Sequence, residues 1–100
     1  MEPSYIEFES TRKYILVVDD NADMRNYLSN LIKKQFDCIS VADGCDALKI
    51  VKSSQRLPDL ILSDVMMPNV DGFELLKALR STQTIPVILL SARTGEASIE

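Results

Sequence analysis

Four short apolar runs dominate the pattern of hydrophobic and polar positions along the chain. They are Tyr14–Val18, Cys38–Ala42, Leu60–Ser63 and Pro86–Leu90. Three of them are almost continuously apolar, as strands covered on both faces are, whereas the second is more mixed, as an edge strand is. The pattern therefore predicts four strands, the second of them at an edge.

Apolar residues at helical spacing fill the stretches between these runs and predict three amphipathic helices. The first helix is expected from Asp23 to about Gln35. The apolar positions are Met24, Tyr27, Leu28, Leu31 and Ile32 in the first helix, Ala47, Leu48, Ile50 and Val51 in the second, and Phe73, Leu75, Leu76 and Leu79 in the third. The final stretch, TGEASIE, is typical of the start of a fourth helix.

This alternation of strands and helices predicts an α/β fold with a doubly wound parallel sheet, because right-handed crossovers place helices on both faces. A length of 100 residues suits one domain. Residues 1–12 are polar and irregular, and we interpret them as an N-terminal arm or linker. Residues 13–100 form the predicted domain.

Composition narrows the class of protein. A net charge of −4 argues against direct binding of nucleic acid, which needs clustered lysine and arginine. No apolar run approaches the roughly 20 residues that span a bilayer, and no signal-peptide pattern opens the chain, so no membrane partner and a cytoplasmic location are expected. The sequence contains no histidine, which excludes histidine bases and histidine metal ligands, and Cys38 and Cys45 are expected to be reduced thiols.

Acidic residues follow two of the predicted strands. Asp19 and Asp20 end the first run, Asp64 ends the third, and Ser91 ends the fourth. In doubly wound sheets, ligands bind beyond the carboxyl ends of the strands. Three carboxylates brought together there repel one another, and a divalent cation offsets that repulsion. An oxygen-only ligand set favours Mg²⁺. The alternative is that Asp19 and Asp20 only cap the following helix.

The segments ILVVDDN, LILSDVMMPNVDGFELL and IPVILLSA resemble, in order and spacing, the receiver domains of two-component response regulators. The resemblance covers residues 14 to 100. The wording VDDNADMR, SDVMMP and LLSARTGE looks most like receivers attached to hybrid histidine kinases. The resemblance to receiver domains implies a flavodoxin-like sheet in the order 2-1-3-4-5. It also implies a role in phosphorelay signalling rather than as an independent enzyme, with a histidine kinase or a histidine phosphotransfer protein as partner.

The resemblance also implies roles for individual residues. Asp64 matches the phosphoacceptor aspartate. Asp19 and Asp20 match the acidic pair that holds Mg²⁺ together with Asp64, and the backbone carbonyl of Met66 completes the protein ligands. Ser91 matches the hydroxyl that contacts the phosphoryl group.

Two further residues, Pro68 and Gly72, match the turn after the acceptor. The same two residues are also ordinary loop punctuation, and both interpretations can hold at once.

The chain reaches Glu100 before the family's fifth strand with its lysine, the aromatic switch residue and the last helix. The resemblance therefore implies a receiver domain truncated after its fourth strand. Ile85 to Leu90 would then form an apolar sheet edge, which predicts self-association through the fourth strand. Slower or shorter-lived phosphorylation is also expected without the lysine.

Two other classes of protein fit parts of the pattern. A phosphohydrolase of the haloacid dehalogenase type also uses an aspartate nucleophile and Mg²⁺, but it needs two acidic residues spaced two apart after the first strand, where this chain has the adjacent Asp19 and Asp20. A receiver-like interaction module that is not phosphorylated would keep the fold without the chemistry.

Overall fold

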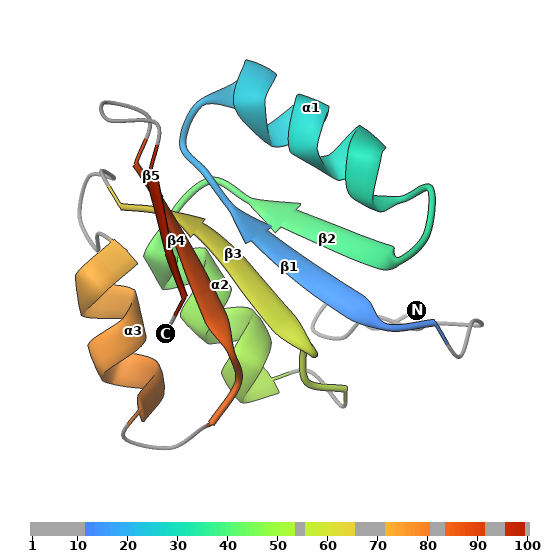
Figure 1. Cartoon of the computed structure of the whole chain (residues 1–100). Helices are drawn as coiled ribbons and strands as arrows, with labels where there is room; N and C mark the ends of the chain where they lie inside the picture. Colours follow the sequence, from blue (N-terminus) through green and yellow to red (C-terminus); the bar gives the residue numbers. More distant parts are fainter. Residues whose placement is uncertain (1–11, 54–55, 66–71, 81–83, 92–95, 100) are drawn as a thin grey trace.

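The computed structural model describes residues 12–53, 56–65, 72–80, 84–91 and 96–99. Strands and helices alternate along the chain until two strands follow one another at its end (Figure 1). The elements are β1 (Tyr14–Val18), α1 (Ala22–Ile32), β2 (Asp37–Val41), α2 (Gly44–Ser53), β3 (Leu60–Asp64), α3 (Gly72–Arg80), β4 (Val87–Ser91) and β5 (Glu96–Ile99).

The sheet has the order β2-β1-β3-β4-β5. The first four strands run parallel, which confirms the predicted α/β class, and β2 lies at an edge as its mixed composition predicted. All five residues of β1 are buried, because β2 and β3 pair with its two sides and helices cover its faces. Central parallel strands are apolar for this reason.

Helix α1 packs on β1 and β2 from one side of the sheet, and α2 and α3 contact each other on the opposite side (Figure 1). The buried core brings together apolar residues of the strands, of α2 and α3, and of the segment just before β4. It consists of Tyr14, Leu16, Val18, Ala47, Val51, Ile61, Leu75, Leu79, Ile85, Val87 and Leu89. Among the described residues, every helix is too short or too polar to cross a bilayer.

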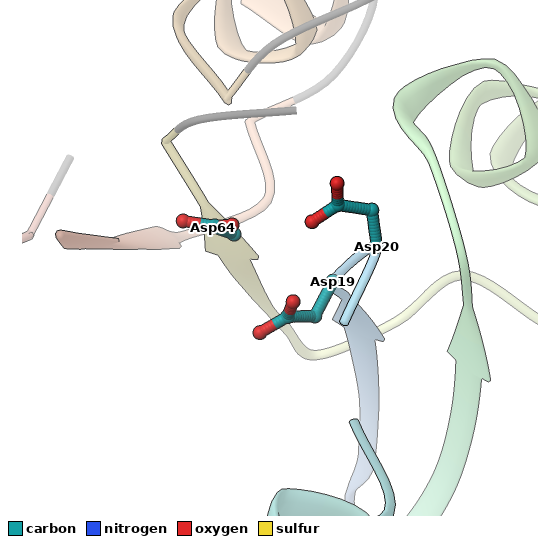
Figure 2. A group of neighbouring side chains, drawn as sticks. All are labelled: Asp19, Asp20 and Asp64. Atoms are coloured by element: carbon teal, nitrogen blue, oxygen red, sulfur yellow. The ribbon is translucent and has the colours of Figure 1, made fainter. Parts of the chain in front are cut away.

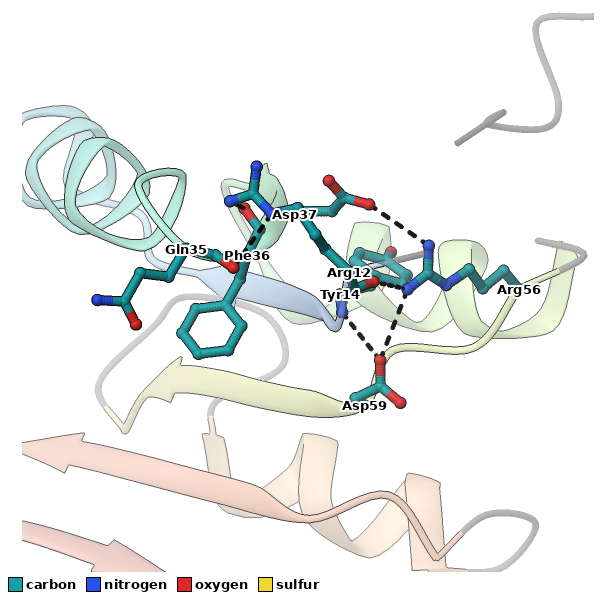
Figure 3. Close-up of polar contacts among 7 residues, drawn as sticks. All are labelled: Arg12, Tyr14, Gln35, Phe36, Asp37, Arg56 and Asp59. Carbon is teal, nitrogen blue, oxygen red and sulfur yellow. Dashed lines mark hydrogen bonds and ion pairs between the residues drawn. The ribbon is translucent and has the colours of Figure 1, made fainter. Parts of the chain in front are cut away.

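Helix α1 ends at Ile32, earlier than the predicted end near Gln35. Beyond that end, the guanidinium group of Arg12 donates hydrogen bonds to the carbonyl oxygens of Lys33 at 2.8 Å, Gln35 at 3.1 Å and Phe36 at 2.9 Å. Figure 3 shows the contacts with Gln35 and Phe36. The last carbonyls of a helix need such partners, and a cation is favourable at that end.

The end of the chain corrects two predictions. The expected start of a helix is instead β5, which pairs antiparallel with β4, so the expectation that Ile85 to Leu90 form a sheet edge is also wrong. Self-association through an exposed fourth strand thereby loses its basis. Only residues 92–95 connect β4 to β5, and a connection that short permits an antiparallel return but no parallel crossover.

A polar cluster around Arg56 fixes the opposite end of the sheet (Figure 3). Its guanidinium group lies 3.4 Å from a carboxylate oxygen of Asp37 and 3.8 Å from one of Asp59, and it donates to the carbonyl oxygen of Arg12. It also lies 5.7 Å from the centre of the Tyr14 ring, and Asp59 accepts a hydrogen bond from the Tyr14 N–H at 2.8 Å. One side chain thus joins the starts of β1, β2 and β3.

We expect Arg56→Ala to lower the free energy of unfolding by about 1–2 kcal/mol, because it leaves two carboxylates and a backbone carbonyl without their common donor. Arg56→Lys should lose part of this amount, since one ammonium group cannot replace the planar fork. Urea denaturation measures both changes. Lys34→Ala, at an exposed position, serves as the control, and an Arg56→Ala protein as stable as the wild type would contradict the prediction.

Candidate functional site

Three carboxylates meet at the carboxyl edge of the sheet (Figure 2). Asp19 and Asp20 follow β1 directly, and Asp64 is the last residue of the neighbouring strand β3. One carboxylate oxygen from each of the three lies within 4.8 Å of the other two. Asp19 is buried, Asp64 is half-buried and Asp20 is exposed, so the group opens from the sheet edge to solvent.

Asp19 is the most buried of the three residues, with only 5% of its surface exposed. Burial raises the pKa of Asp19, the hydrogen bond from the Asn21 N–H at 2.9 Å opposes that rise, and the nearby charges of Asp64 and Asp20 add to it. Arg25 fixes the same residue by donating to its carbonyl oxygen at 2.8 Å. The negative charge of Asp19 is therefore held in place at a cost in free energy.

Capping of α1 falls to Asn21, and neither Asp19 nor Asp20 is the N-cap residue. The Asn21 side-chain oxygen accepts a hydrogen bond from the Met24 N–H at 2.9 Å. Asparagine is among the preferred N-cap residues, so its position after the acidic pair could have identified it. The interpretation of the acidic pair as a simple helix cap is thus wrong.

Gly72 lies against the backbone of Asp64 at the start of α3. Its N–H donates to the carbonyl oxygen of Val65 at 3.0 Å. A Cβ atom at this position would lie 2.6 Å from the Asp64 carbonyl oxygen, 3.0 Å from the Val65 Cα and 3.1 Å from a side-chain carbon of Leu89. The close approach of α3 to the end of β3 therefore requires glycine.

Ser91 is the last residue of β4. The register of β3 and β4 pairs Asp64 with Leu90, which places the Ser91 backbone one position further along the same edge. The side chain of Ser91, the carbonyl of Met66 and the turn residue Pro68 lie outside the residues that the structure describes.

The donor set fits Mg²⁺. Three carboxylates supply oxygen ligands only, and their mutual repulsion favours a hard divalent cation. Within the described ranges, no second group of three acidic or cysteine side chains has this geometry. Cys38 and Cys45 are free thiols, and burial raises the pKa of Cys38.

Comparison with known proteins assigns the chain to a family. The family model for the response regulator receiver domain matches residues 15–100. The alkaline phosphatase synthesis transcriptional regulatory protein PhoP of Bacillus subtilis is 45% identical over 60 residues, which cover 59% of this chain and 24% of that protein. Histidine kinase P4 of Formosa agariphila is 37% identical over 62 residues, which cover 62% of this chain and 4% of that protein. The chain thus spans a small part of these relatives.

Solved structures agree with this assignment. The receiver domain of the Francisella response regulator 1452 has a TM-score of 0.73 and 34% identity, over 80% of this chain and 66% of that one. The Vibrio cholerae chemotaxis protein CheY4 has a TM-score of 0.72 and 32% identity, over 80% of this chain and 68% of that one. With a matching order of the four parallel strands, an acidic cluster at the expected edge and a family model that covers nearly the whole chain, the protein belongs to the family of response regulator receiver domains.

Proposed function

We propose that this chain is a phosphoacceptor of a two-component system, which takes a phosphoryl group from a phosphohistidine onto Asp64 with the help of Mg²⁺. The observation that carries the proposal is the convergence of Asp19, Asp20 and Asp64 in a member of the receiver family. The donor is a histidine kinase or a histidine phosphotransfer protein. The domain acts as a signalling element in the cytoplasm, whose only chemistry is its own phosphorylation and dephosphorylation.

The reaction is a phosphoryl transfer. A carboxylate oxygen of Asp64 attacks phosphorus, the bond from phosphorus to the donor imidazole breaks, and the imidazole keeps the electron pair and takes up a proton. Bound Mg²⁺ would neutralise charge on the phosphoryl oxygens. Asp19, Asp20, Asp64 and the Met66 carbonyl would hold the cation.

Phosphorylation then changes the surface around the site. An aspartyl phosphate adds negative charge and acceptor oxygens at the end of β3, within reach of the Ser91 hydroxyl in the proposed arrangement. A contact made only in the phosphorylated state shifts the balance between two conformations of the partner-binding surface.

The direct test is incubation with a small acyl phosphate donor in Mg²⁺ and, separately, in excess chelator. Intact mass should increase by one phosphoryl group in Mg²⁺ only, and hydroxylamine should remove it because the product is an acyl phosphate. Incorporation that resists hydroxylamine, or that proceeds equally in chelator, would count against the proposal.

The cation itself should stabilise the fold. A Mg²⁺ concentration about tenfold above its dissociation constant should add about 1.4 kcal/mol to the free energy of unfolding. Asp19→Asn should lose most of this increment, because it removes a ligand charge but keeps an oxygen for the Asn21 N–H. Denaturation with and without Mg²⁺ measures it. Asp23→Asn, in the first turn of α1, should keep the full increment.

In chelator, Asp19→Asn should instead raise the free energy of unfolding. The pKa of Asp19 is raised in the folded state, so the folded protein retains this proton to a higher pH than the unfolded chain. Between the two pKa values the free energy of unfolding therefore falls as pH rises. Asp19→Asn should abolish this dependence and be more stable than the wild type at neutral pH. A variant that is less stable in chelator would contradict this account.

An apolar stripe on α1 supports a docking surface for the phosphodonor protein. Met24, Tyr27 and Leu31 have 42%, 60% and 45% of their surfaces exposed, although periodicity placed all three on the core side of the helix. Their spacing puts them on one face of α1, and the stripe begins one turn from Asp20. Exposed apolar stripes of this kind mark protein contacts, and a donor that reaches Asp64 must cover neighbouring surface.

Tyr27→Ala should slow transfer from a phosphorylated histidine phosphotransfer protein by about tenfold, the effect of losing about 1.4 kcal/mol of contact. Labelling by the small acyl phosphate should be unchanged, because that donor needs no docking surface. Leu57→Ala removes an exposed apolar side chain just before β3, at the other end of the sheet, and serves as the matched control. If Tyr27→Ala slowed phosphorylation equally with both donors, the substitution would act on the acidic site and not on docking of the donor protein.

A further inference from the structure

Strand β5 forms one edge of the sheet. Among the described elements, β4 is the one with which it makes extensive contact. The other edge strand, β2, contacts α1 and α2 as well as β1. The two edges therefore differ, because helices flank β2 while β5 is held mainly through its ladder with β4.

The hydrogen bonds between β3 and β4 show which N–H and C=O groups of β4 face β5, and hence which groups of β5 face outward. The carbonyl oxygen of Pro86 accepts a hydrogen bond from the N–H group of Ile61 on β3 at 3.0 Å, and that of Leu90 accepts one from the N–H group of Val65, just after β3, at 2.9 Å. Backbone groups alternate in direction along a strand, so the groups of Leu89 face β5.

The register then identifies the residues of β5 that face β4. Leu89 pairs with Ser98, and Ser91 pairs with Glu96. Glu96 and Ser98 thus direct their N–H and C=O groups toward β4. Ala97 and Ile99 direct theirs away from the sheet.

Two features that protect sheet edges from pairing are present at this outer edge, which is four residues long and contains the charged residue Glu96, but others are absent. None of the residues of β5 is proline, lysine or arginine, and the register with β4 runs without a bulge over its four pairs. Such an edge is a template for another extended strand.

We infer that the outer edge of β5 pairs antiparallel with β5 of a second copy of this chain, so that the two sheets become continuous. With Ala97 opposite Ile99 of the second copy, both outward-facing residues of each copy form hydrogen-bonded pairs about a two-fold axis. This two-fold contact gives a closed dimer, whereas pairing of β5 with β2 of another copy is head-to-tail and would give an open-ended chain of copies. The inference does not depend on phosphorylation.

The pair should be weak. A four-residue edge is far smaller than the interface of a stable dimer. The net charge of −4 on each copy also opposes association, so added salt should strengthen it. Both features predict a reversible dimer that forms at high protein concentration.

Sedimentation equilibrium over a wide range of concentration and salt tests the inference. Ala97→Pro removes an outward N–H from each copy and should lower the association constant by about tenfold or more. Ala97→Thr keeps the N–H and is the matched control. Protection of the Leu89 amide from hydrogen exchange shows whether β5 still pairs with β4 in each variant.

Ile99→Pro is a second variant with the same expected loss, should Ala97→Pro disturb β5. A wild-type chain that stays monomeric at every concentration would overturn the inference. So would Ala97→Pro and Ile99→Pro chains that keep the Leu89 amide protected and associate as strongly as the wild type.

Discussion

Asp64→Asn should lower phosphoryl incorporation by at least about 10³-fold, because a side-chain amide has the shape of the carboxylate but is not a competent nucleophile. The substitution also removes one of three mutually repelling charges, so the folded protein should be no less stable than the wild type in chelator. Loss of labelling with retained stability separates a chemical role from a structural one. Intact mass after incubation with a small acyl phosphate measures the first, and urea denaturation the second.

The chain offers a matched control at the other end of the same strand. Asp59 precedes β3, lies in the cluster around Arg56 and is far from the acidic site along the strand. Asp59→Asn should cost stability but leave labelling at the wild-type level. Full labelling of Asp64→Asn would refute the assignment of the acceptor, and its transfer to Asp20 would reveal an alternative acceptor.

Gly72→Ala should be the most destabilising of the small substitutions near the site. The new Cβ would lie 2.6 Å from a backbone oxygen of Asp64, which cannot move as a flexible side chain can. Overpacking of this kind costs about 1–3 kcal/mol, although alanine is otherwise the better helix residue. Relief of the clash must shift either α3 or the end of β3, where Asp64 lies. The increase in the free energy of unfolding caused by Mg²⁺ should therefore fall as well.

Lys77→Ala, at an exposed position of the same helix, tests whether α3 is simply sensitive to substitution. We expect it to change the free energy of unfolding by less than about 0.5 kcal/mol. A Gly72→Ala protein that is as stable as the wild type would show that α3 can move away from β3 freely.

The parallel part of the sheet could be predicted from sequence because its strands are short apolar runs, and acidic residues mark the ends of β1 and β3. Tyr14–Val18 matches β1 residue for residue, and the meeting of Asp19 and Asp64 follows from two parallel neighbours that end at the same edge. The roles of Ser91 and Met66 rest on the family resemblance and remain proposals.

The remaining features depend on tertiary contacts that local pattern does not contain. Helical spacing predicted that Tyr27 lies in the core, but the residue is exposed. Spacing alone does not show how much of the apolar face of α1 the sheet covers. The turn after α1 is held by Arg12, which lies more than twenty residues before the carbonyls that it binds. For β5 a signal was present, since Glu96, Ala97, Ser98 and Ile99 alternate polar and apolar as a strand does.

The pairing of β1 with β3 is a precondition for the acidic site during folding. It joins Tyr14 to Asp59 and Ile15 to Leu60, residues 45 positions apart, so it closes a long loop. Asp19 and Asp64 come together only after this closure, and the acidic group does not exist in a chain that has formed α1 alone. A cation bound there would stabilise only those conformations in which β1 and β3 are paired, so it would retard any unfolding step that separates the two strands, and the lifetime of the native state would follow the supply of Mg²⁺.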